Sequence, residues 1–174
     1  MRLLIINPGA TSTKIAVYED ETEAFSSSIL HAPQELAGFA RVVDQLELRE
    51  RLVREALSTA GYAPDSFDAV CSRGGLVRHI PSGTYTIDDQ VIHDIYNPPF
   101  GEHASSLGPL IARSIADEAK IPALLVDPVS VDELQPVARI SGLAGMERES
   151  FFHALNQKAV ARKAAGDLGK PYES

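Results

Sequence analysis

The sequence has very little cysteine and no tryptophan. Its 174 residues include one cysteine, Cys71, which excludes an internal disulfide and cannot alone form a thiolate metal site. Long apolar runs are also missing, since the longest, Leu3 to Ile6 and Ile121 to Val126, are far too short to span a bilayer. The first residues lack the apolar stretch and cleavage site of a signal peptide, so we expect a cytoplasmic protein with no membrane partner.

Positive charge is in short supply as well. The chain has 16 Lys and Arg against 24 Asp and Glu, a net charge of −8, and no basic cluster stands out. A nucleic-acid-binding surface needs a basic stripe, so we expect no nucleic-acid partner. A small anionic ligand is compatible with this balance, because a few well-placed cations and backbone N–H groups are enough to bind it.

The apolar pattern predicts an α/β domain with a packed core. The main elements follow the order βββ-α-β-α-β-α. We expect strands at 2–7, 14–19, 23–30, 67–71, 84–87 and 121–126, and helices at 35–60, 88–96, 105–120 and 151–168. A further strand would come next in such a pattern, so we interpret the chain as part of a longer architecture; a complete small domain is the alternative.

The turn after the first strand has the composition of a phosphate-binding loop. It runs Asn-Pro-Gly-Ala-Thr-Ser-Thr-Lys from Asn7 to Lys14. Backbone N–H groups in such a turn can bind phosphate oxygens, and Ser12 and Lys14 add a hydroxyl donor and a positive charge. It is not a P-loop, because the Gly-Lys-Ser/Thr order is missing and a strand follows. An ordinary hairpin turn is the alternative.

Arg73, Gly74 and Gly75 follow the fourth strand. The two glycines let the backbone approach a ligand closely, and Arg73 can contact a carboxylate or phosphate with two donors. Ligands of α/β sheets bind at these strand ends. The alternative is a tight turn with a solvated arginine.

Three more residues are candidates for the same chemistry. His103 precedes a helix whose N-terminus attracts anions. Asp127 ends an apolar strand, where a carboxylate can hold Mg²⁺, and Asp132 and Glu133 are alternative carboxylates for this role. His153 begins the last helix, where it can contact a phosphoryl group. The alternative for each residue is a purely structural role, as a capping, turn or helix residue. Together, however, they supply the groups that phosphoryl transfer needs.

Long segments of the chain resemble the butyrate kinases, in the order found in that family and over almost the whole length. These segments are RLLIINPGATSTKIAVYEDE, SRGGLVRHIPSGTY, GEHASSLGPLIA, IPALLVDPVSVDEL, ARISGL and FFHALNQKAVARKAA. The resemblance implies the superfamily of acetate kinases, actin-like ATPases and sugar kinases. It therefore implies an actin-like (ribonuclease H-like) α/β domain, with a mixed sheet and helices on both faces.

Members of this family have two such domains, with the nucleotide between them. By resemblance, residues 1–174 are the N-terminal acid- and phosphate-binding domain, and the second, nucleotide-binding domain is absent from this sequence. The implied reaction is the reversible, Mg²⁺-dependent phosphorylation of butyrate, or a branched short-chain acid, by ATP. We expect this half to be inactive alone and the protein to form a homo-oligomer. The alternatives are an acetate or propionate kinase, and a non-catalytic domain that binds a ligand or partner.

The resemblance also assigns roles to individual residues. Asn7, Ser12 and Lys14 match the first phosphate loop, although Ala10 replaces a serine common in acetate kinases. The remaining matches are Arg73 with Gly74 and Gly75 for the acid or phosphoryl group, His103 for the acid, Asp127 for Mg²⁺, and His153 for the phosphoryl group. Arg73, Asp127 and His153 are the expected catalytic set. Gln157 stands where acetate kinases carry a second histidine.

Overall fold

The structure is a computed structural model that describes residues 1–173. Within this range the chain forms six strands and five α-helices, joined by loops that contain four short 3₁₀ helices. The strands are β1 (Arg2–Pro8), β2 (Ser12–Glu19), β3 (Thr22–Leu30), β4 (Ala69–Arg73), β5 (Thr84–Thr86) and β6 (Ala123–Val126). The helices are α1 (Pro33–Leu36), α2 (Leu46–Thr59), α3 (Asp89–Tyr96), α4 (Leu107–Ala119) and α5 (Ala154–Asp167).

All the strands belong to one mixed sheet with the order β3-β2-β1-β4-β6-β5. Strands β1, β4 and β6 are parallel to one another, whereas β2, β3 and β5 run antiparallel to their neighbours. The C-terminal ends of β1, β4 and β6 therefore meet at one edge, where α/β sheets usually bind ligands.

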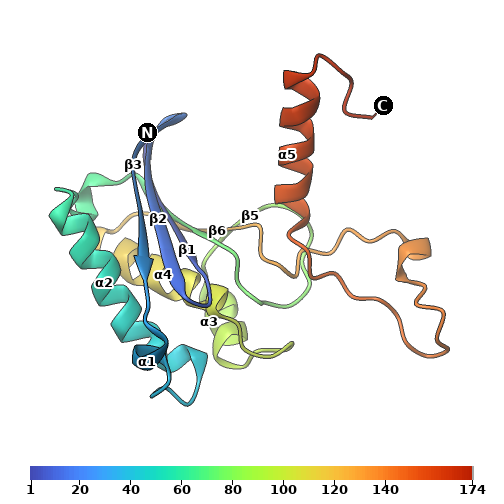
Figure 1. Cartoon of the computed structure of the whole chain (residues 1–174), viewed down its shortest axis with the longest axis horizontal. Coiled ribbons are helices and arrows are strands. Elements are labelled where there is room, and N and C mark those ends of the chain that lie inside the picture. The colour runs from blue at the N-terminus through green and yellow to red at the C-terminus, as the bar shows by residue number, and fades with distance from the viewer. Residues whose placement is uncertain (174) are drawn as a thin grey trace.

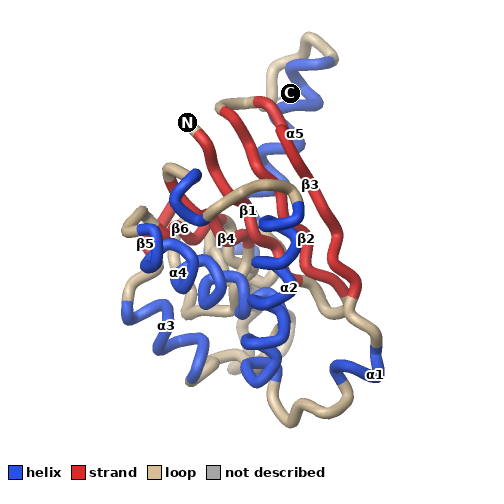
Figure 2. The backbone as a smooth tube through the Cα atoms, turned by 90° about the vertical axis from the view of Figure 1, so that its left-hand side faces the viewer, coloured by secondary structure: helices blue, strands red, loops and turns tan. Residues whose placement is uncertain are grey.

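Helices α2 and α4 cover one face of the sheet (Figure 2). Alternate strand residues such as Leu4, Ile6 and Val70 point to these helices and are completely buried. The same core takes in Val53 of α2 and the long apolar face of α4. Burial of this face explains why the apolar periodicity of the sequence located these elements.

The opposite face of the sheet is open. Leu3, Ile5 and Asn7 of β1 lie on this face and are only partly buried. Helix α5 lies on this side but stands clear of the strands (Figure 1). Ala154 is buried, whereas the other side chains of α5, all within the described range, are partly or fully exposed. Helices thus lie on both sides of the sheet, as expected, but only the α2–α4 side is packed. No helix in residues 1–173 is long and apolar enough to cross a membrane.

The helix expected over 35–60 is interrupted. Its first part is the short α1, and α2 begins only at Leu46. Between them Arg41 is extended, because the Glu102 carboxylate accepts hydrogen bonds from the Arg41 Nε and the Val42 backbone N–H, each at 2.6 Å. These contacts also lower the pKa of Glu102, with the backbone N–H bond from Val42 as the largest cause. A contact between residues 60 positions apart therefore overrides the local helical pattern.

Candidate functional site

Arg73, Asp127 and His153 lie together at the C-terminal edge of β4 and β6. Arg73 is the last residue of β4 and pairs with Val126, so Asp127 follows directly beside it. The Arg73 Nη2 lies 3.5 Å from Asp127 Oδ2, and the His153 Nδ1 lies 3.2 Å from the same oxygen. The structure thus brings together the three residues expected to be catalytic, although 80 positions separate the first from the last.

Asp127 organises this cluster from a buried position, with a relative exposure of 4%. Its Oδ1 accepts a hydrogen bond from the backbone N–H of Leu155 at 3.1 Å, which caps the first turn of α5. Its backbone carbonyl accepts a hydrogen bond from His153 Nδ1 at 2.9 Å. Asp127 and His153 both have a left-handed backbone, with φ of 52° in each. Such strain is held in place by surrounding contacts and is often found at functional sites.

This cap explains where α5 begins. The sequence predicted a helix from Phe151, but the left-handed backbone of His153 breaks helical geometry, and α5 begins at Ala154. The Asp127 carboxylate that supplies the cap lies 28 positions earlier, so no local sequence signal could reveal it.

His103 and Gly74 extend the cluster toward α4. The His103 Nδ1 lies 2.8 Å from Ser105 Oγ. Gly74 has φ of 91°, and a Cβ there would lie 3.0 Å from Ser105 Cβ and 3.9 Å from His153 Cε1. Glycine is needed at position 74 for both its backbone angle and this close approach. Gly75 instead packs against Pro109, on the side of α4.

Asn7 and Lys14 occupy the open face of the sheet next to Arg73. They pair across β1 and β2, and the pairing of Ile6 with Ser72 places Asn7 beside Arg73. Asn7 and Lys14 line an open hollow of about 390 Å³ on this face. Within residues 1–173, no carboxylate lies within ion-pair distance of Lys14, so its charge is available to a ligand. Ser12 is the first residue of β2, directly after the turn, and its carbonyl accepts a hydrogen bond from the Gly9 N–H.

Sequence reasoning missed a buried arginine under this turn. Arg49 of α2 has a relative exposure of 0% and donates to the backbone carbonyls of Gly9 and Ala10, at 2.8 and 3.0 Å. The sequence did hold a signal, since Leu46, Arg49 and Val53 follow helical spacing on the apolar side of α2. A charged residue in an apolar stripe points to a buried polar contact.

The surroundings of Asp127 do not form a magnesium site on this chain alone. Within residues 1–173 no group of three His, Cys, Asp or Glu side chains could hold a metal ion. The Asp127 oxygens already face the Leu155 N–H, Arg73 and His153. Mg²⁺ prefers carboxylate, water and phosphate oxygens, so the role of Asp127 as a magnesium ligand stays a prediction.

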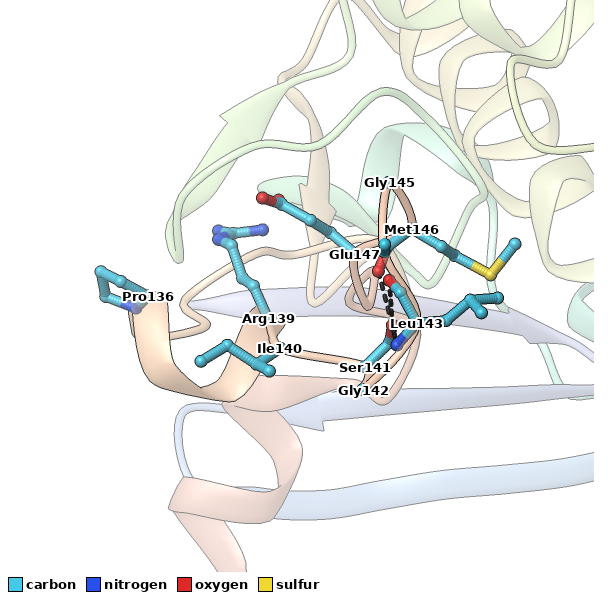
Figure 3. Close-up of a pocket in the computed structure, with 10 residues that line it drawn as sticks. Pro136, Arg139, Ile140, Ser141, Gly142, Leu143, Gly145, Met146 and Glu147 are labelled. Carbon is cyan, nitrogen blue, oxygen red and sulfur yellow. Dashed lines mark hydrogen bonds between the residues drawn. The ribbon is translucent and has the colours of Figure 1, made fainter.

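Another hollow lies away from this cluster. It measures about 600 Å³ and lies in the exposed loop of residues 136–147, whose lining contains none of the expected site residues (Figure 3). Ser141 holds this loop through contacts with Leu143 and Met146. Its apolar side chains, including Ile140, Leu143 and Met146, are more than half exposed. The hollow therefore belongs to a protruding loop and not to the cluster.

Several solved structures resemble this chain over nearly its whole length, and three of them are kinases. They are an acetate kinase from Porphyromonas gingivalis (TM-score 0.61, 14% identity, 98% of this chain), a propionate kinase from Francisella tularensis subsp. tularensis (0.63, 12%, 97%) and an acetate kinase from Entamoeba histolytica (0.62, 12%, 97%). No family model matches the sequence. Identities this low show a shared fold, and they confirm the expected α/β domain of the actin-like ATPase type.

The chain covers only part of each of these proteins. It spans 50%, 49% and 46% of their respective lengths. The shared fold is therefore that of about half of each neighbour.

Proposed function

We propose that this chain is the acid- and phosphate-binding half of a carboxylate kinase, and specifically of a butyrate kinase. The observation that carries the proposal is the convergence of Arg73, Asp127 and His153 on one edge of the sheet, beside Asn7 and Lys14. The three structural neighbours are acetate and propionate kinases, which supports the general class. The sequence resemblance supports butyrate as the acid.

The proposed reaction is an in-line transfer. A carboxylate oxygen of the acid forms a bond to the γ-phosphorus of ATP, the bond from that phosphorus to the bridging oxygen breaks, and ADP leaves with the electron pair. Carboxylic acids titrate near pH ~4, so the nucleophile is already ionised at neutral pH and needs no general base. Catalysis then depends on positioning and on stabilising the charge of the phosphoryl oxygens.

Arg73 is suited to hold the acid or the phosphoryl group. Its guanidinium is about one-third exposed and its contact with Asp127 is long, at 3.5 Å. Most of its donors are therefore free for a bound anion, which a guanidinium can contact with two parallel hydrogen bonds.

His153 is suited to stabilise charge in transfer. Its Nδ1 donates to the Asp127 carbonyl, so its Nε2 can donate to a phosphoryl oxygen only when the ring is protonated on both nitrogens. The Asp127 carboxylate oxygen lies 3.2 Å from the same Nδ1 and helps to hold the ring in this orientation. Asp127 thus acts in the proposal as the residue that orients His153 and Arg73.

The nucleotide-binding half is proposed to face the open side of the sheet. The structural neighbours are about twice as long as this chain, which is consistent with a second domain. In this proposal Mg²⁺ arrives with ATP as part of the co-substrate. The exposed apolar side chains of loop 136–147 and α5 are available for contacts with that domain or with another copy of the chain.

The decisive test is acyl-phosphate formation by the native protein that contains this chain. Trapping the product with hydroxylamine, for acetate, propionate, butyrate and isobutyrate, gives kcat/KM for each acid. We expect butyrate or isobutyrate to be preferred, but one methylene is worth only about 1–3 kcal/mol. A preference for acetate or propionate would instead favour an acetate or propionate kinase. No product with any acid would refute a carboxylate kinase.

A further inference from the structure

Arg49 controls the conformation of the turn between β1 and β2. Its two terminal nitrogens donate to consecutive backbone carbonyls, Nη1 to Gly9 at 2.8 Å and Nη2 to Ala10 at 3.0 Å. The Gly9 N–H donates to the Ser12 carbonyl at 2.7 Å and closes the turn from the other side. Both peptide planes that follow Gly9 and Ala10 are therefore fixed by one side chain.

The direction of these carbonyls fixes the direction of the next two N–H groups. In a trans peptide the C=O and the following N–H point in opposite directions, and no peptide bond described here is cis. Because Arg49 draws the carbonyls of Gly9 and Ala10 toward α2, the N–H groups of Ala10 and Thr11 point away from it. Both residues are exposed, and neither N–H donates to another residue within 1–173.

Among the described residues 1–173, Arg49 makes no contact with an anionic group. Its other contacts are neutral: the Gln45 side-chain oxygen, at 2.9 and 3.1 Å, and the Thr13 hydroxyl at 3.3 Å. No carboxylate of residues 1–173 lies within ion-pair distance of it. Burial lowers the pKa of its guanidinium. An uncompensated buried cation is costly, and an anion bound on the outer side of the turn would reduce that cost.

We propose that Arg49 is a positioning residue that turns the Ala10 and Thr11 N–H groups outward to bind phosphoryl oxygens. Two successive free N–H groups form the small concave anion site seen in phosphate-binding turns. Lys14 lies on the adjoining open face and adds a positive charge. The inference rests on the proposed function only for the nature of the anion, a phosphoryl group of ATP or of the acyl phosphate.

The first test uses the wild-type chain and inorganic phosphate, followed by ¹⁵N NMR. We expect saturable shifts of the Ala10 and Thr11 amide signals, and a shift of the Arg49 Nε–H, which donates to Gln45. If the signals around Arg73 and His153 respond while those of the turn do not, the inference about Arg49 is overturned and the proposed function stands. If no signal responds at saturating phosphate, both are overturned.

The second test compares variants of one helix. Arg49→Gln removes the charge, Arg49→Lys keeps the charge but not the planar fork, and Arg51→Gln is the matched control, since Arg51 is exposed and paired with Glu55. In folded protein, judged by a dispersed NMR spectrum, we expect phosphate binding to weaken about tenfold or more in Arg49→Gln. The phosphate affinity of Arg49→Lys should lie between those of wild type and Arg49→Gln, and the affinity of Arg51→Gln should match that of wild type.

Equal phosphate affinity in folded Arg49→Gln and wild type would overturn the proposal, because a purely structural role would leave the turn amides able to bind. If Arg49→Gln does not fold, the Arg49→Lys variant provides the test of the proposal. Wild-type affinity and unchanged shifts of Ala10 and Thr11 in that variant would refute positioning by the guanidinium fork.

Discussion

The backbone carbonyl of Asp127 accepts a hydrogen bond from the Nδ1 of His153 at 2.9 Å, which fixes the ring that we propose contacts the phosphoryl group. The same residue caps α5 through its side chain. Asp127 therefore contributes to the cluster in two separable ways, through its backbone and through its carboxylate.

Substitutions of Asp127 should separate these contributions. Asp127→Ala removes the acceptor for the Leu155 N–H and places alanine at φ of 52°. Loss of a cap costs about 1 kcal/mol and a left-handed alanine about 1–2 kcal/mol. We expect faster amide exchange in the first turn of α5. Asp127→Asn keeps an oxygen acceptor and tolerates the left-handed backbone, so exchange should stay near wild type. Equal exchange in both variants would contradict the capping role.

Replacement of Arg73 should act on catalysis far more than on folding. It is one-third exposed, and its contact with Asp127 is long. In the native protein, Arg73→Ala should lower kcat/KM for the acid about 100-fold or more, as the loss of a charge-stabilising donor does. Arg73→Lys should recover only part of this, because a lysine cannot form two parallel hydrogen bonds. Thermal unfolding of the same variants should change little. Near-normal turnover of Arg73→Ala would remove Arg73 from the mechanism.

His31 should make stability depend on pH. Its ring is buried and lies 2.8 Å from Thr13 Oγ1. Burial, and then the nearby charge of Arg49, lower the pKa of His31 below its usual 6.5. Below that pH the unfolded chain binds a proton that the folded chain does not, so the free energy of unfolding should fall as pH falls toward the folded pKa.

Urea unfolding between pH 7.5 and 5 measures this dependence. His31→Gln should flatten it. The comparison variant is His93→Gln, at a histidine that is mostly exposed. A slope that is identical in all three proteins would show that His31 does not titrate with folding.

Gly108 should not tolerate a side chain. A Cβ at Gly108 would overlap with Ser72 Oγ and lie 3.0 Å from Pro8 Cδ, where α4 packs on the ends of β1 and β4. Alanine favours helices by about 1 kcal/mol over glycine, but overpacking costs about 1–3 kcal/mol. We expect net destabilisation of Gly108→Ala in urea unfolding.

Two further variants test the cause. Ser72→Ala removes the nearest obstructing atom, so it should recover part of the loss in the double variant. Gly166→Ala in α5 has no atom within 4 Å of the added carbon and should be neutral or stabilising. A Gly108→Ala variant as stable as Gly166→Ala would contradict the packing.

The sequence predicted the parts of the fold that depend on short-range patterns. The strands of the first hairpin and helix α4 agree with the structure to within a few residues, because burial on one face produces a clear periodicity. The starts of α2 and α5 were placed too early. Glu102 and Asp127 set those boundaries from distant positions, and such contacts leave no local signal.

The candidate site shows the same division. Arg73, Asp127 and His153 were identified from their places at strand and helix ends, and the structure brings them together. Arg49 was missed because a helical arginine is usually solvated. The convergence of separate strand ends at one edge of the sheet depends on the order and direction of the strands, and no short-range pattern in the sequence gives these.

Helix α5 is joined to the rest of the molecule near its base, by the buried Ala154, the Asp127 cap and the ion pair of Lys158 with Glu133. Its 14 residues make a stiff rod about 21 Å long, so a tilt of about 10° at His153 would carry its far tip about 4 Å. The rod therefore magnifies small rearrangements around Asp127. A probe attached at Leu168, at the tip, would therefore report a small rearrangement at the Asp127 carboxylate as a change in distance.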